Sequence, residues 1–341
     1  MLAGTDLSGK DLSGVFLDGV LFLETNLREA RLERASLKGC RFVRADMRGV
    51  RLVEADLTEC RMDGCMLAGV QGSNSSWRGS LIQETDFTGG IFRAADFSQA
   101  ILSGCNLENA CFQEAAMVNA SVLDCRLKEA DFSAADLTRF TAPDNDLSLC
   151  RFPGAVLCMA ILKGARLDGV SWAGCKMAQA VLTGASLREA DFSGLDMARI
   201  RLTGSVLTGA RFRGSRGEYA SFHQAGMNWA DLSNSVFHSA DFSGASLDSA
   251  VMSGMAAHNA IFRNSSCQKT SFNSAQLPYT DFSHSVVKEA DFSGADLTGA
   301  NLHGQVTYRT RWDSANLTLI RKTDPDLLAA ETWKSPLLSR T

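Results

Sequence analysis

Ten cysteines and five histidines are the side chains of this sequence that could bind a metal ion or act as nucleophiles. The cysteines include no C-x-x-C pair with the spacing of a zinc site. His238 and His258 are twenty residues apart, and such a pair could hold a metal ion if a third ligand joined it. No third ligand recurs at that spacing, so we interpret both as surface histidines. The sequence also has no nucleophile elbow or phosphate-binding loop, and we expect no catalytic residues, cofactor or metal.

Aspartates are the third group that could do chemistry, because paired carboxylates serve as acids and bases. Many of them stand one residue before a large apolar residue, and this placement recurs along the whole chain. Recurrence favours a structural role, since an aspartate can accept a hydrogen bond from a backbone N–H of its own turn. We predict this role for Asp86, Asp96, Asp131, Asp191, Asp281 and Asp291.

A five-residue phrase accounts for the spacing of all these residues. In the stretch 289–304, EADFSGADLTGANLHG, a large apolar residue recurs every five positions. The same register holds from Leu7 to Leu317 without insertion or deletion. A small residue, usually alanine, stands two positions before each large one, and glycine usually stands two positions after it. Because glycine and asparagine tolerate positive φ, we expect a left-handed turn at that later position.

A period of five fits neither a strand nor a helix, whose periods are two and 3.6. It requires a chain that turns a corner in every phrase, so four phrases close a coil of about twenty residues, and the coils stack at the strand spacing. Residues twenty apart should then stack, as two aromatic columns suggest: Phe92, Phe112, Phe132, Phe152, Trp172, Phe192 and Phe212, then Phe222, Phe242, Phe262 and Phe282. We predict an all-β fold of about sixteen such coils.

These phrases resemble the pentapeptide-repeat family, whose motif is A-[D/N]-L-x-x. The resemblance covers roughly residues 3–319. It implies a right-handed quadrilateral β-helix, and the handedness comes from the resemblance alone.

The register also places the cysteines. Seven occupy the small inward position and Cys267 replaces a large residue, so we expect buried core thiols and a reducing compartment. Cys111 and Cys158 fall on outward positions and are the more reactive candidates. The seven are Cys40, Cys60, Cys65, Cys105, Cys125, Cys150 and Cys175.

Breaks in the repeat are the places to look for function. Gly217 replaces a large residue with no compensating neighbour, which predicts a local dent. The surrounding stretch 211–230 carries arginine, tyrosine and tryptophan at outward positions, and these residue types often anchor interfaces. We hypothesise a partner surface there, formed by Arg211, Arg213, Arg216, Gly217, Tyr219 and Trp229.

An outward apolar strip is a second candidate surface. The position before each large residue faces out, yet on one face it holds Leu81, Ile101, Ile161, Val181 and Ile261. Ile161 and Val181 should stack directly and could form part of an interface. Ordinary cross-strand pairing of β-branched residues is the alternative interpretation.

The register fails after Leu317, which divides the chain into a repeat domain, 1–319, and a C-terminal segment, 320–341. The segment predicts a helix with Asp324 as N-cap and Pro325 in the first turn. Its apolar residues, Leu327, Leu328 and Trp333, should cover the last coil. The N-terminal end has no such cap, so we expect an upstream domain, a second copy or another protein there.

Composition narrows the range of functions. The net charge is −4 with acids and bases interspersed, which argues against nucleic acid as a partner. No signal peptide or membrane span is visible, so we expect a cytoplasmic protein. Uniform outward columns offer a surface for protein partners and no pocket for a small-molecule substrate, so we favour a non-catalytic binding scaffold.

Three specific functions are compatible with the sequence. Long unbroken pentapeptide repeats with a short helical tail resemble accessory or effector-adaptor proteins of bacterial type VI secretion. Other family members mimic DNA and protect gyrase or topoisomerase, but mixed charge argues against that reading. A secreted effector that binds host proteins or membranes is the third.

Overall fold

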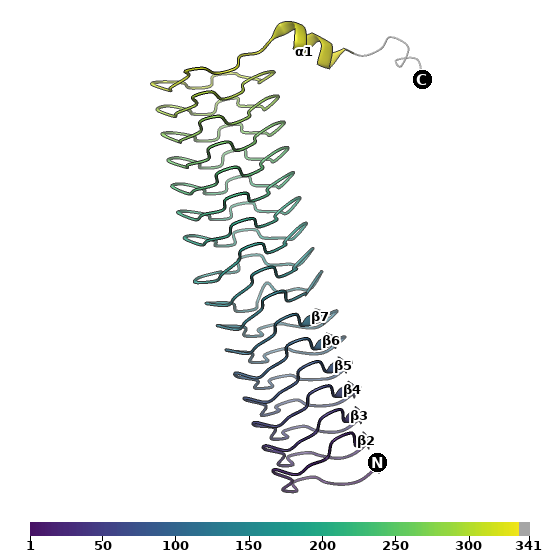
Figure 1. Ribbon diagram of the computed structural model, residues 1–341. Coiled ribbons are helices and arrows are strands. Elements are labelled where there is room, and N and C mark those ends of the chain that lie inside the picture. Colours follow the sequence, from purple (N-terminus) through teal and green to yellow (C-terminus); the bar gives the residue numbers. More distant parts are fainter. Residues whose placement is uncertain (334–341) are drawn as a thin grey trace, which may run out of the picture. The chain divides into compact units, whose positions relative to one another are not determined.

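The computed structural model describes residues 1–333, and the chain forms two compact units, Met1–Arg201 and Leu202–Thr341. Within each unit the chain winds into stacked coils (Figure 1). In the first unit one side of the coils forms a seven-stranded sheet with the order β1-β2-β3-β4-β5-β6-β7. The strands are β1 (Leu2–Ala3), β2 (Leu21–Leu23), β3 (Arg41–Val43), β4 (Arg61–Asp63), β5 (Leu81–Gln83), β6 (Ile101–Ser103) and β7 (Ser121–Leu123).

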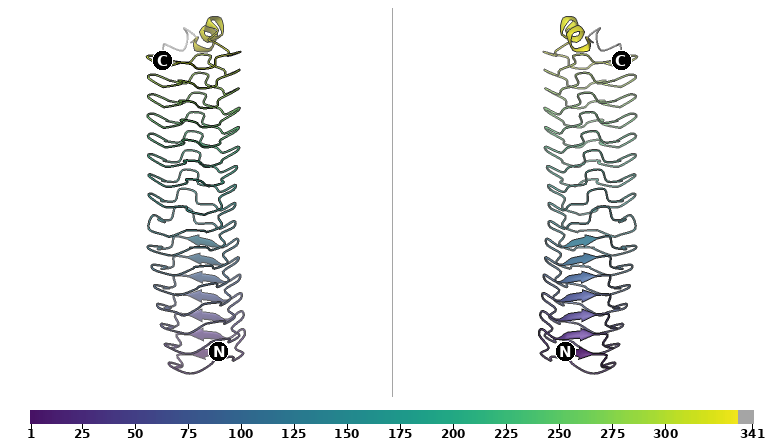
Figure 2. Two further views of the ribbon diagram at one scale, coloured as in Figure 1. Left: turned by 90° about the vertical axis from the view of Figure 1, so that its left-hand side faces the viewer. Right: turned by 90° about the vertical axis from the view of Figure 1, so that its right-hand side faces the viewer.

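Each strand from β1 to β6 pairs in parallel with the strand that follows it, at a register of twenty residues. Phe22 of β2 pairs with Phe42 of β3, and Ile82 of β5 pairs with Leu102 of β6. The strands lie one above another along one face of the unit (Figure 2). The predicted repeat of twenty residues is therefore confirmed for these coils.

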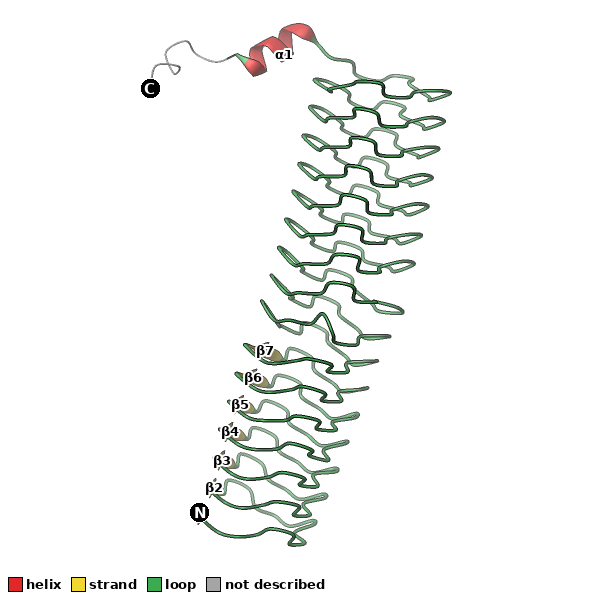
Figure 3. Cartoon of the chain, turned by 180° about the vertical axis from the view of Figure 1, so that it is seen from behind, coloured by secondary structure: helices red, strands yellow, loops and turns green. Residues whose placement is uncertain are grey.

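Outside the named strands the ladder continues as single parallel bridges, so most of the chain is drawn as loop (Figure 3). Bridges also join residues twenty apart, as Arg31↔Arg51 does in the first unit and Asp281↔Asn301 in the second. Over residues 1–333 the fold is an all-parallel β-solenoid with one short helix at its C-terminal end. Single-residue bridges suffice because the chain turns a corner before a longer strand can form.

The large apolar residue of each phrase forms the core, as predicted. The rings of Phe222, Phe242, Phe262 and Phe282 are fully buried and stack with centroid separations of 4.8, 4.8 and 4.6 Å. In the first unit the column from Phe92 to Phe192 stacks in the same way. Ring stacking at about the strand spacing lets identical aromatic residues fill successive coils without a void.

Positive φ is needed at the turn of nearly every phrase, and glycine is not the only residue that adopts it. Gly294 and Gly299 have φ of 68° and 69°, as expected. Glu24, Arg34 and Trp229 adopt values of 50°, 58° and 58° at the equivalent positions. The coil geometry thus imposes a left-handed turn whatever the side chain, although this conformation is costly for residues that have a Cβ.

Gly217 does not leave the dent that the sequence predicts. It is buried, and a Cβ placed on it would overlap Cε1 of Phe237, which lies twenty residues further along. The ring from the next coil therefore fills the space. Gly72 shows the same arrangement, since a Cβ there would lie 3.0 Å from Cδ1 of Phe92. The prediction was wrong because the compensating residue is the vertical neighbour, not a neighbour along the chain.

The predicted C-terminal helix exists as α1, Pro325–Thr332, with Asp324 as N-cap. The carboxylate of Asp324 accepts hydrogen bonds from the backbone N–H groups of Asp326 and Leu327 at 3.0 and 3.1 Å. Across residues 1–333, no helix has the length and apolarity to cross a bilayer.

The apolar side of α1 does not cover the last coil in the way predicted. None of its residues is buried, Leu327 is 49 % exposed and Trp333, just after it, is 69 % exposed. Leu328 is only half-buried. The helix is instead attached through polar contacts, which include a bond from the Gly304 N–H to Thr323 Oγ1 at 3.2 Å.

The recurrent aspartates accept hydrogen bonds in their own turns, which confirms their structural interpretation. All six that we singled out accept a bond from the backbone N–H two residues further on. At Asp296 both the hydroxyl and the N–H of Thr298 donate to Oδ1, at 2.6 and 3.0 Å. The hydroxyl contact is the main reason that the pKa of Asp296 lies below its ordinary value.

We expect acid to destabilise the fold through these carboxylates. A group whose pKa is lower in the folded state contributes stability that is complete above its unfolded pKa, near 3.9, and disappears as pH falls through the folded value. The pKa is lowered at Asp6, Asp11, Asp46, Asp56, Asp131, Asp146, Asp231, Asp291 and Asp296. The thermal midpoint measured by circular dichroism should therefore fall as pH drops below about 4. An unchanged midpoint between neutral pH and about pH 3 would contradict this.

Candidate protein-binding site

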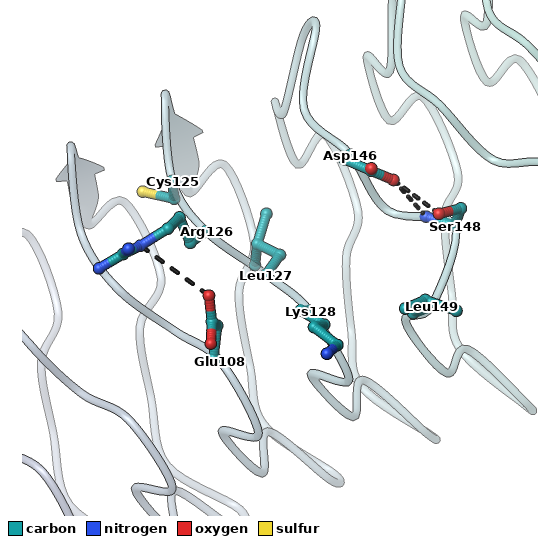
Figure 4. A pocket seen from close by; sticks show the side chains of 8 residues that line it. All are labelled: Glu108, Cys125, Arg126, Leu127, Lys128, Asp146, Ser148 and Leu149. Atoms are coloured by element: carbon teal, nitrogen blue, oxygen red, sulfur yellow. Dashed lines mark hydrogen bonds and ion pairs between the residues drawn. The ribbon is translucent and has the colours of Figure 1, made fainter.

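The ladder of the first unit opens between two coils just after β7. One coil before the opening, two backbone bonds flank the bridge between Asn106 and Arg126: Arg126 N–H donates to Cys105 O at 2.9 Å and Leu107 N–H donates to Arg126 O at 2.7 Å. One coil further on, among the described residues, no such bond joins Asp146 N–H to Cys125 O, Leu127 N–H to Asp146 O, or Glu129 N–H to Ser148 O. We call the facing segments 125–129 and 145–149 the seam (Figure 4).

Asn145 explains why the seam opens. It occupies the small inward position, where the equivalent residues are mostly Ala, Ser, Thr or Cys, and its side chain is longer. Its Oδ1 accepts from Cys125 N–H at 3.1 Å, and its Nδ2 donates to Val122 O at 3.0 Å and Pro143 O at 2.9 Å. The buried amide is thus fully engaged between the coils, and its bulk prevents the backbones from closing.

Two smaller openings further along the first unit have the same cause, a bulky residue at the small inward position. Among the described residues, no backbone bond joins Ser171 N–H to Cys150 O or Asp196 N–H to Cys175 O. Val170 and Leu195 stand twenty residues after these cysteines, so a bulky side chain again lies over a thiol. Cys125, Cys150 and Cys175 are 9, 7 and 5 % exposed, whereas the other five cysteines that we predicted to be buried show at most 1 %.

At the seam the opening forms a cavity of about 260 Å³. Leu149 stands at its edge, 56 % exposed. Arg126 lies 3.9 Å from Glu108, and Asp146 accepts from Ser148 Oγ at 2.7 Å, so both signs of charge line the space (Figure 4). The Ser148 hydroxyl is also the main cause of the lowered pKa of Asp146. The cavity combines an apolar edge, charged side chains and strand groups that lack their ladder partners.

The surface predicted around Gly217 does not form one patch. Tyr219 and Trp229 are 59 and 62 % exposed. They are ten residues apart, half of the twenty-residue register, so they lie on opposite sides of the coil. Arg213 lies 3.2 Å from Asp231, and Arg211 and Arg216 are exposed. The role of these residues in partner binding stays a prediction. No single flat partner surface could contact both aromatic rings.

The apolar strip is discontinuous. Ile161 and Val181 are bridge partners, as expected, and Ile161 is 41 % exposed. Ser121 and Thr141 separate this pair from Leu81 and Ile101 in the same column. Ile261, in the second unit, lies between Asp241 and Asp281. The strip is thus a set of short patches, and its role as an interface stays a prediction.

The cysteine positions are confirmed. All eight predicted core thiols are buried, and Cys111 and Cys158 are half-buried. Burial raises the pKa of Cys150 to about 12 and that of Cys175 to about 11, which keeps both as unreactive thiols at neutral pH. The two smaller openings therefore expose Cys150 and Cys175 slightly without activating them.

The histidines are arranged in two pairs. His238 and His258 lie next to each other on adjacent coils, as their spacing predicts, with ring centroids 4.6 Å apart and ring planes tilted by 52°. His284 and His303 instead meet Glu331 of α1, a cluster that sequence reasoning missed. The repeat fixes the positions of His284 and His303 but not that of Glu331, which lies on the helix after the repeats. No sequence signal could therefore have predicted this group.

A parallel β-solenoid whose core and turns recur every five residues is a repeat protein. This chain belongs to the pentapeptide-repeat family. Eight copies of the Pentapeptide repeats pattern match residues 2–39, 25–64, 80–117, 160–197, 173–204, 196–234, 227–264 and 265–304. No curated protein matches the chain.

Solved structures of pentapeptide repeat proteins are similar to it at low TM-score. HetL, involved in heterocyst differentiation regulation in Nostoc sp. strain PCC 7120, is 20 % identical over 91 % of this chain and 88 % of its own, with a TM-score of 0.17. Full-length QnrB1, a plasmid-mediated fluoroquinolone resistance protein, is 17 % identical over 59 % of this chain and 93 % of its own, with a TM-score of 0.26. A pentapeptide repeat protein of the Arabidopsis thaliana thylakoid lumen is 33 % identical over 38 % of this chain and 66 % of its own, with a TM-score of 0.16. Similarity at these TM-scores says nothing about function.

Proposed function

We propose that this protein is a non-catalytic protein-binding scaffold, and more specifically an accessory or effector-adaptor component of bacterial type VI secretion in the cytoplasm. The general function rests on the seam. The type VI assignment is narrower and rests on the resemblance of a long unbroken repeat with a helical tail to such components.

The seam supports protein binding because it leaves more backbone groups without a ladder bond than the two smaller openings of the first unit do. Leu127, Glu129 and Asp146 present N–H groups there, and Cys125, Asp146 and Ser148 present carbonyl oxygens. Unpaired groups of a strand edge bind extended peptides by adding a strand, and side-chain pockets beside the edge supply specificity. An exposed Leu149 and flanking charges of both signs suit a peptide that has an apolar residue between charged ones.

We also propose the finer description of the fold. Bridges at four positions within the twenty residues of a regular coil support a four-sided shape, and the register from Leu7 to Leu317 supports about sixteen such coils. We propose the right-handed winding of the β-helix from family membership alone. The division into a repeat domain, 1–319, and a C-terminal segment, 320–341, belongs to the same proposal.

Partner capture from the native bacterium tests the function. The tagged full chain should recover type VI spike components, and Leu149→Asp should abolish that recovery because it places a charge on the apolar edge. Ile161→Asp and Trp229→Ala are matched controls at similarly exposed side chains, and both should retain the partner. Recovery of gyrase in place of spike components would support the DNA-mimic alternative. Loss of the partner only in Ile161→Asp or Trp229→Ala would move the site to the strip or to the Gly217 region.

Asn145→Ala is a sharper test, because it should close the seam without damaging the fold. Alanine is the common residue at this position, so the missing backbone bonds should form. The ladder bonds that form replace the three hydrogen bonds of the Asn145 side chain, so we expect the free energy of unfolding to stay within about 1 kcal/mol of its original value while partner recovery falls. A variant of unchanged stability that still binds its partner would show that the seam is not the binding site.

A further inference from the structure

His284, His303 and Glu331 bring three potential metal ligands together where α1 meets the last coils of the second unit. Nε2 of His284 lies 3.2 Å from Glu331 Oε2, and Nε2 of His303 lies 3.1 Å from the same oxygen. All three ligand atoms lie within 4.8 Å of one another. The cluster lines a cavity of about 290 Å³.

The two histidines are held by the coils, and the carboxylate is supplied by the helix. His303 is 7 % exposed, so its ring is fixed by its surroundings. The ring of His284 lies over Gly304, where a Cβ would come within 2.5 Å of Nδ1. The absence of a side chain at Gly304 therefore allows the ring to reach Glu331.

We propose that these three side chains form a binding site for a divalent transition metal, with zinc as the best fit. Two imidazole nitrogens and a carboxylate are a ligand set that zinc uses, with a water as fourth ligand. In a tetrahedral site with bonds of about 2.0–2.1 Å, neighbouring ligand atoms lie roughly 3.3 Å apart, close to the two nitrogen–oxygen separations observed. A metal ion would join α1 to the coils, and this link matters because none of the helix residues is buried.

The tautomer of His303 shows what metal binding must change. Its Nδ1 accepts a hydrogen bond from Asp324 N–H at 3.2 Å, so the ring proton is on Nε2 and points at Glu331. A metal on Nε2 moves this proton to Nδ1, and the Asp324 contact is then lost. One neutral hydrogen bond is a small loss against three metal–ligand bonds.

Calorimetric titration of the full chain with Zn²⁺, under a non-chelating reductant, tests the site. We expect saturable binding of one ion, weakened at least tenfold in His284→Ala, His303→Gln and Glu331→Gln. Glu331→Gln is the most informative variant, because its amide oxygen can still accept the hydrogen bond from His303 but carries no charge. His258→Ala is the matched control and should bind as the parent does.

Co²⁺ absorption separates this site from the cysteines. Binding by histidine and carboxylate should give weak visible bands without the near-ultraviolet charge-transfer band of a cobalt thiolate. Absence of one-ion binding, a thiolate band, or equal affinity in Glu331→Gln would overturn the proposal and leave the cluster as a hydrogen-bonded attachment of α1. These outcomes do not depend on the seam, so failure here would leave the proposed scaffold function untouched.

Discussion

Replacing Phe242 by alanine is expected to lower the free energy of unfolding by about 3–5 kcal/mol. Its ring is fully buried and lies 4.8 Å, centroid to centroid, from both Phe222 and Phe262, with interplanar angles of 1° and 5°. Truncation removes two stacking contacts and leaves a cavity that neighbouring coils cannot fill, because their backbones are fixed by the ladder. Guanidinium denaturation followed by circular dichroism measures the change.

Trp229→Ala is the control for this prediction, since it also removes an aromatic ring from the second unit. Trp229 is 62 % exposed, so the loss should stay within about 0.5 kcal/mol. Similar losses in the two variants would mean that the stacked column is not what stabilises the coil.

Gly217→Leu is expected to destabilise the protein by about 1–3 kcal/mol, although it restores the residue type that the repeat prescribes. The space that a leucine needs is occupied by Phe237, whose Cε1 would overlap even the first carbon of the new side chain. The backbone of Gly217 lies outside the left-handed region, so the effect would report crowding alone. The unfolding midpoint in guanidinium checks the expectation.

The double variant Gly217→Leu with Phe237→Leu provides the decisive comparison. If the two positions share one space, exchanging the ring of Phe237 for a smaller side chain makes room for the leucine at position 217. Part of the stability lost in Gly217→Leu should then return. Simple addition of the two single effects would contradict the proposed exchange of volume between coils.

Most of the fold could be predicted because one five-residue rule decides core, turn and register together. Phe42, Phe242 and Leu297 are buried because each is the large apolar residue of its phrase. An error in the register at one of them would therefore have been an error at all of them. The cysteines and turn aspartates followed from the same rule. The helix was predicted from its cap, since Asp324 and Pro325 act locally.

The features that were missed depend on pairs of residues in space. The filling of Gly217 by Phe237 and the opening at Asn145 require a comparison of side-chain sizes twenty residues apart. A search of the inward positions for a bulky residue over a cysteine would have found Cys125, Cys150 and Cys175. The meeting of His303 with Glu331 and the exposure of Leu327 depend on where α1 lies, which no repeat can specify.

The seam has a consequence for how the first unit holds together. Each coil bonds only to the coils before and after it, so stability adds along the stack through nearest neighbours. Where three pairs of backbone groups lack their ladder bonds, that coupling is weakest, and the unit should melt as two blocks that meet between Cys125 and Asn145. A peptide seated in the seam would supply the missing bonds and join the blocks into one cooperative body. Binding would then increase the rigidity of coils far from the seam.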